Sequence, residues 1–158
     1  MTTGLVITSM LLSWIAVVVA FWAIHKYRAL QSARHFIDLF AMESEEILSD
    51  DHFPEEVKNS LSLAAAHITD SRLAKRLASE ISKMDGADDP PTARAIAGLP
   101  DELQSKVFRA AWFFLMALSY AHADGWKLRR RLNTNPSERE AARPIAWMAS
   151  HPDELAAA

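Results

Sequence analysis

The apolar residues of the chain form one long uninterrupted run, followed by several periodic stripes. Residues 5–24 read LVITSMLLSWIAVVVAFWAI and contain no charged residue, Gly or Pro. Twenty residues in an α-helix span about 30 Å, which is the thickness of the hydrocarbon core of a bilayer. The run therefore predicts a transmembrane helix.

A cleaved signal peptide is the alternative interpretation of this run, because Val18, Val19 and Ala20 resemble a small-residue cleavage site. However, residues 1–4 carry no Lys or Arg, and Phe21 continues the apolar run beyond the candidate site. The run is also longer than the roughly 7 to 15 apolar residues of a signal peptide. We therefore expect an anchor that stays attached to the chain.

Basic side chains follow the apolar run but do not precede it. By the positive-inside rule, this asymmetry predicts that the N-terminus lies outside and the rest of the chain lies in the cytoplasm. Arg outnumbers Lys, which is typical of GC-rich bacterial genomes, so we expect the membrane to be a bacterial inner membrane. The residues expected at the membrane interface are Trp22, Lys26, Tyr27 and Arg28.

The predicted helix has no signal that ends it at the membrane surface. No Gly or Pro occurs between Leu5 and Phe53, so we expect one helix that reaches about Leu48. We expect its cytoplasmic part to pack within its own domain, with self-association as the alternative, because the apolar stripe is too short for a free-standing coiled coil. The stripe consists of Leu30, Ala33, Ile37, Phe40, Ser44 and Ile47.

Shorter amphipathic segments predict further helices. One starts near Pro54, and a second runs from about Ser71 to Met84, before a linker at residues 86–92. A longer helix starts at Asp101, and its residues 110–123 carry no charge. This segment is too short to span a bilayer, so we expect it to form the centre of the core, with an interfacial helix as the alternative.

The last part of the chain predicts one short helix. Residues 137–140 have a capping-box pattern, and Pro144 is expected to limit the helix to one or two turns. The predicted class is all-α, with a transmembrane helix that continues into a small cytoplasmic bundle of four to five helices. The predicted divisions are an anchor at 1–27, a helical domain at 28–132 and a tail at 133–158.

The composition supports helices and removes several kinds of chemistry. Seven Pro and four Gly in 158 residues disfavour a turn-rich β fold. The absence of Cys excludes disulfides, thiolate zinc sites and cysteine nucleophiles. The sequence contains no HExxH, P-loop, GxGxxG or GxSxG motif. We therefore expect no catalytic residue, cofactor or metal, and the enzymatic alternative is a site around His67, Asp70 and His122.

Acidic residues dominate the segment that follows the predicted anchor. Residues 38–56 contain eight Asp and Glu and no Lys or Arg. Anionic lipid would repel such a segment, so we expect it to meet a basic partner. The alternative is a solvated face that pairs internally with Arg72, Lys75 and Arg76. The candidate partner-binding residues are Glu43, Glu45, Glu46, Asp50 and Asp51.

A basic cluster beside a tryptophan occurs near residue 130. Such a cluster favours binding to lipid headgroups, and nucleic acid is the rival ligand. We expect no nucleic acid, because the net charge of the chain is −3 and no DNA-reading motif is present. An ordinary charge cluster at a helix end is the simpler alternative. The candidate headgroup-binding residues are Trp126, Lys127, Arg129, Arg130 and Arg131.

Together these features predict a non-enzymatic membrane protein that functions by binding. We expect an accessory subunit, adaptor or assembly factor of a membrane complex. Its expected partners are the bilayer and another membrane protein. A membrane-tethered module for headgroups or nucleic acid is the first alternative, and a small membrane-anchored enzyme is the second.

Overall fold

Every regular element in the described part of the chain is an α-helix, which confirms the predicted all-α class. The structure is a computed structural model that describes residues 2–80, 91–122, 125–132 and 138–151, with side chains at 10–70, 72–77, 79, 91–122, 125–130 and 144–151. The helices are α1 (Thr2–Ser49), α2 (Glu55–His67), α3 (Ser71–Glu80), α4 (Pro91–Ala97), α5 (Asp101–Ala121), α6 (Gly125–Leu132) and α7 (Glu138–Ser150).

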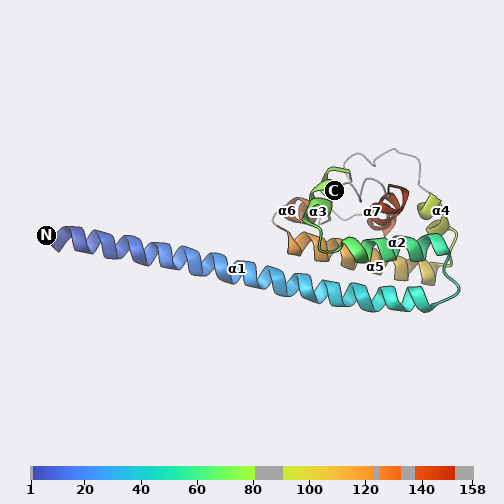
Figure 1. The fold of residues 1–158 in the computed structure, drawn as a ribbon, viewed down its shortest axis with the longest axis horizontal. Helices are drawn as coiled ribbons and strands as arrows, with labels where there is room; N and C mark the ends of the chain where they lie inside the picture. Colours follow the sequence, from blue (N-terminus) through green and yellow to red (C-terminus); the bar gives the residue numbers. More distant parts are fainter. Residues whose placement is uncertain (1, 81–90, 123–124, 133–137, 152–158) are drawn as a thin grey trace.

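The first helix is a single element of 48 residues, which confirms the prediction of one helix that continues beyond the apolar run to about Leu48. At 1.5 Å per residue its length is about 72 Å. Figure 1 shows its N-terminal half projecting away from the other helices, while its C-terminal half lies alongside them. All described side chains from Met10 to Arg28 are exposed, and Ala33 is the first buried residue of α1.

The second half of α1 packs antiparallel to α5, and this is the most extensive helix contact in the domain. The Phe40 ring lies 5.5 Å from the Phe114 ring, measured between centroids. Earlier on α1, Phe36 stacks on Tyr120 at 5.7 Å. Later residues of α1 therefore meet earlier residues of α5. This register places the C-terminal end of α5 beside the first buried turn of α1.

The predicted stripe on α1 faces this contact. Ala33, Phe40, Ser44 and Ile47 are buried, so packing within the chain's own domain is confirmed. The buried hydroxyl of Ser44 donates a hydrogen bond to the Phe40 carbonyl oxygen at 2.6 Å, so its burial leaves no unpaired donor. Leu30 is 51% exposed, and its assignment to the stripe was wrong because the other helices cover α1 only beyond this point.

The middle of α5 forms the centre of the hydrophobic core, as the uncharged segment 110–123 predicts. It contacts α1 on one side and α6 and α7 on others, so little of its surface reaches solvent. The fully buried apolar residues of this segment are Ala110, Ala111, Phe114, Leu115, Ala117 and Leu118. Burial on nearly all sides explains why the segment contains no charge.

The structure corrects two predicted helix boundaries. Pro144 lies inside α7, which has 13 residues instead of one or two turns. A proline inside a helix removes one backbone hydrogen bond. Here the flanking Ile145 and Met148 are buried against the core, and this packing keeps the helix continuous. Helix α4 starts at Pro91, which shortens the predicted linker, and Pro suits a first helical position. The predicted helix end at Met84 and the capping box at Ser137 lie outside the described residues.

Truncation of the central aromatic residue should destabilise the domain strongly. Phe114→Ala removes a fully buried ring that contacts Phe40, so we expect the free energy of unfolding to fall by about 3–5 kcal/mol. Urea denaturation of the purified chain in mild detergent, monitored by circular dichroism, measures this change. Met42→Ala serves as the control because Met42 is 61% exposed, and it should cost less than about 0.5 kcal/mol. Equal effects would contradict the assignment of the core.

The close contact of α6 with α5 requires glycine at position 125. A Cβ atom at Gly125 would lie 2.1 Å from the Ser119 carbonyl oxygen and 2.7 Å from the Ser119 Cα. Gly125→Ala should therefore displace α6 and cost about 1–3 kcal/mol of stability in the same denaturation assay. Gly98→Ala is the matched control, because a Cβ atom there would lie 3.5 Å from its nearest neighbour. A stable Gly125→Ala variant would show that α6 does not pack as described.

Candidate functional site

No described part of the domain covers the side chains of α1 from Met10 to Ile24. Large apolar side chains between Met10 and Ile24 are 50% to 74% exposed. By length and composition, α1 is the one helix among the described residues that could cross a membrane. This exposed surface is continuous along the helix, whereas soluble monomers rarely expose apolar patches larger than a few hundred Å².

The four residues expected at a membrane interface lie between this apolar half and the first buried turn. All four, Trp22, Lys26, Tyr27 and Arg28, are exposed. The Lys26 ammonium lies 4.9 Å from the centre of the Trp22 ring, and the Gln31 amide donates a hydrogen bond to the Tyr27 hydroxyl at 3.0 Å. These four residues combine two aromatic rings with two long cationic side chains, and membrane interfaces favour this combination.

The predicted headgroup-binding cluster lies on α6, which packs on α5 through the buried side chain of Leu128. Trp126, Lys127 and Arg130 are exposed, and the Lys127 ammonium lies 5.9 Å from the Trp126 ring centre. Arg129 is only half-exposed, because its guanidinium lies 4.5 Å from the ring centre of Tyr120. The Arg131 side chain lies outside the described residues.

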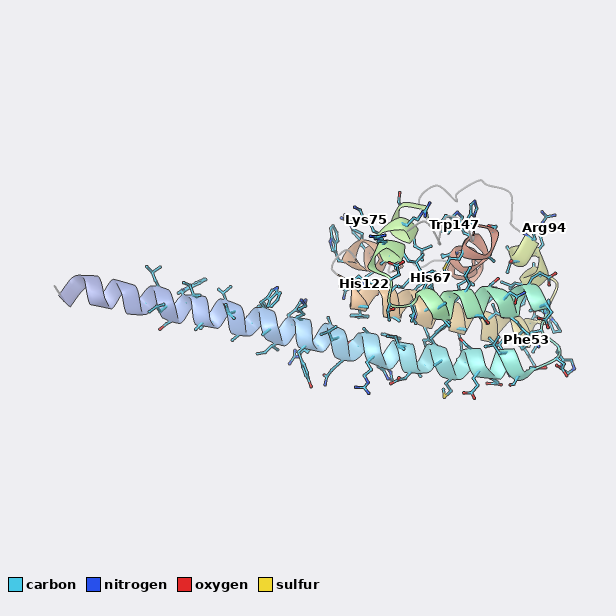
Figure 2. The ribbon with its side chains drawn as sticks, in the orientation of Figure 1. Phe53, His67, Lys75, Arg94, His122 and Trp147 are labelled. Carbon is cyan, nitrogen blue, oxygen red and sulfur yellow. The ribbon has the colours of Figure 1, made fainter. Side chains whose placement is uncertain are left out.

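Helix α3 brings further cations to the same end of the domain. It contacts α6, and every charged side chain described on these two helices is basic. Figure 1 shows both helices at the end of the domain that is nearer to the exposed half of α1. Figure 2 shows Lys75 at this end, and Arg94 and Phe53 at the opposite end. We name this surface the basic end, and it consists of the exposed residues Arg72, Lys75, Trp126, Lys127 and Arg130.

Two of the five acidic candidates form ion pairs within the domain. The Glu43 carboxylate is 3.3 Å from the Arg109 guanidinium and is largely buried, with a side chain 13% exposed. Glu46 pairs with Lys106, and its hydrogen bond raises the pKa of the Lys106 ammonium. Internal pairing of these acids is therefore real, but their partners lie on α5 and not at Arg72, Lys75 or Arg76.

The other three acidic candidates lie near the far end of α1. Asp50 accepts a hydrogen bond from the His52 backbone N–H at 2.9 Å, and this bond lowers the pKa of the Asp50 carboxyl. Glu45 and Asp51 are exposed. Lys106 and Arg109 lie in the last turn of α5 before its uncharged segment. Sequence alone does not reveal that Arg109 meets Glu43 and that Lys106 meets Glu46 across the contact between α1 and α5.

Among the residues of the enzymatic alternative, Asp70 lies beside both histidines, because its backbone N–H donates a hydrogen bond to the His67 carbonyl oxygen at 3.0 Å and its charge acts on His122. Asp70 accepts a hydrogen bond from the Arg72 backbone N–H at 2.8 Å, where α3 begins. His122 follows the C-terminus of α5, and burial lowers its pKa although the nearby charge of Asp70 opposes this. Within the described residues, no three His, Cys, Asp or Glu side chains form a group that could hold a metal ion.

An apolar groove between α1 and α2 is a feature that sequence analysis missed. It is open to solvent, has a volume of about 580 Å³ and runs beside the buried Phe40 and Ile68. Its walls come from residues more than 15 positions apart in the chain, so no local pattern predicts it. The lining residues are Ile37, Phe40, Ala41, Ser44, Glu45, Leu48, Ser49, Ala65 and Ile68.

Comparisons of the chain with family models, with curated proteins and with solved structures find no match. The structural features that bear on function are the exposed apolar side chains of α1, the continuity of α1 with the core, and the separation of basic from acidic residues along the domain.

Burial of His122 should make stability depend on pH. No described residue offers a hydrogen-bond partner to its buried Nε2 atom, and burial lowers its pKa below the ordinary value of 6.5. The folded state therefore binds this proton more weakly than the unfolded state does, so the free energy of unfolding decreases as the pH falls below about 6.5. His122→Gln should reduce this decrease in urea denaturation at pH 7.5 and pH 5.5. An unchanged pH dependence in the variant would contradict the assignment.

Proposed function

We propose that the chain is a single-pass protein of a bacterial inner membrane, with its N-terminus outside and its helical domain in the cytoplasm. In this proposal the domain acts as an accessory subunit, adaptor or assembly factor of a membrane complex. The observation that carries the proposal is that one helix, α1, exposes every described side chain from Met10 to Arg28 and packs its second half against the core of the domain.

The exposed half of α1 supports the anchor. Water would have to solvate the exposed apolar side chains from Met10 to Ile24, about four turns of helix, whereas a bilayer would cover them favourably. The cations that follow the apolar run support the orientation, because Lys26, Arg28 and Arg34 all lie on the side of the domain. The cytoplasmic bundle would then consist of the second half of α1 together with α5 and the helices that pack around it.

The continuity of α1 favours a binding role over a freely tethered domain. A flexible linker would let the domain sample many heights and orientations, whereas a continuous helix fixes its distance from the membrane. An adaptor benefits from such fixed geometry, because a partner in the same membrane meets a preorganised surface. The exposed acids Glu45 and Asp51 lie toward the far end of α1, where anionic headgroups do not repel them.

Co-purification tests this function directly. The full chain, carrying a C-terminal tag, is isolated from membranes in mild detergent, and mass spectrometry identifies proteins that co-elute in a fixed ratio. We expect one membrane protein or complex. Glu45→Lys combined with Asp51→Lys should reduce its recovery severalfold, because both changes reverse charge at the proposed contact.

A matched variant controls for the added positive charge. Asn59→Lys combined with Ser62→Lys places lysines at exposed positions of α2 and should leave partner recovery unchanged. A chain that elutes alone under several detergents, with or without a crosslinker applied in intact cells, would contradict the adaptor proposal. A chain that separates from the membrane in alkaline carbonate would contradict the anchor itself.

A further inference from the structure

We propose that the basic end of the domain rests on anionic lipid headgroups of the membrane that anchors the chain. This inference depends on the anchoring function proposed above. Its basis is the joint position of α3 and α6, which lie at the end of the domain nearer to the exposed half of α1 (Figure 1). The two helices are separated by more than 40 residues in the chain, so this joint surface exists only in the folded domain.

The register of α1 against α5 determines the height of this surface. The apolar run ends at Ile24 and the first buried residue of α1 is Ala33, so the domain begins about 14 Å beyond the hydrocarbon core. The headgroup layer occupies about 5–8 Å of that distance. The remaining gap is close to the Debye length of about 8 Å at physiological ionic strength. Long Lys and Arg side chains extend into this gap, and a tilt of α1 reduces it further.

The charges along the domain have the sign that this contact requires. The basic end carries four exposed cations and the half-exposed ring of Trp126, an aromatic residue suited to the interface. Among the described acids, Asp70 lies where α3 begins and is half-buried. Exposed acids instead lie where α2 and α5 begin, at the end of the domain that carries Arg94 (Figure 2). These acids are Asp51, Glu55, Glu56, Asp101 and Glu102.

Contacts behind the surface hold it in place. Arg129 lies over the Tyr120 ring, which in turn stacks on Phe36 of α1. Leu128 is fully buried beneath α6, so the exposed side chains of this helix face away from the core. The basic end is therefore tied rigidly to the anchor helix. Each cation near an anionic surface shifts the docking equilibrium by about fivefold, so four act strongly together.

Lysine footprinting of the reconstituted full chain tests the inference. The chain is placed in vesicles of phosphatidylcholine alone, or of phosphatidylcholine mixed with phosphatidylglycerol, and labelled with an amine-reactive reagent. Mass spectrometry compares the labelling rates of Lys75 and Lys127 with that of Lys58 on α2. We expect severalfold slower labelling of Lys75 and Lys127 in the phosphatidylglycerol vesicles only, with the protection lost at high salt.

Two variants separate height from charge. Seven neutral helix-forming residues inserted after Arg28 add about two turns and raise the domain by about 10 Å with its rotation nearly preserved, so protection should disappear. Arg72→Gln combined with Arg130→Gln should weaken the protection of both lysines. Arg94→Gln, at the opposite end of the domain, should leave it unchanged (Figure 2).

The outcomes distinguish this inference from the proposed function. Equal labelling in both kinds of vesicle, with a chain that floats with vesicles and resists carbonate extraction, overturns the docking and leaves the anchor standing. A chain that does not float overturns both. Protection that also occurs in phosphatidylcholine alone, or that appears only when an RNA oligonucleotide is added, overturns the assignment to anionic lipid.

Discussion

The rings of Phe36 and Phe40 on α1 pack against Tyr120 and Phe114 on α5, and this antiparallel contact determines the position of every other part of the molecule. It fixes the register of the two longest helices. Because α5 is buried on its remaining sides by α6, α7 and other helices, the same contact ties the whole domain to α1. A shift of one turn along α1 would move the domain by about 5 Å relative to the exposed apolar half.

Two ion pairs reinforce this register at the edge of the contact. Glu43 meets Arg109, and Glu46 meets Lys106, so acids at a three-residue spacing on α1 face bases at the same spacing on α5. Solvent screens pairs at a partly exposed edge, so their contribution to stability is small beside the burial of the aromatic rings. Their value lies in specificity, because a register shifted by one turn would separate both pairs.

The sequence predicts those parts of the fold that local patterns determine. The length of α1 follows from the absence of Gly and Pro before Phe53, and the core position of α5 follows from its uncharged segment. Patterns that depend on distant partners were predicted less well. Pro144 should end a helix by local rules, yet burial of Ile145 and Met148 keeps α7 intact. Likewise, nothing local shows that α3 and α6 share one end of the domain.

We conclude that the exposed and the packed halves of α1 form one unbroken helix, and a distance measurement in a bilayer tests this claim. The chain has no native Cys, so Leu12→Cys and Leu30→Cys, both at exposed positions and five turns apart on one face, give a clean pair of spin-label sites. Electron–electron double resonance should show one narrow distribution near 27 Å. A broad distribution, or one centred at a much shorter distance, would show that α1 bends or breaks at the membrane surface and would contradict the claim.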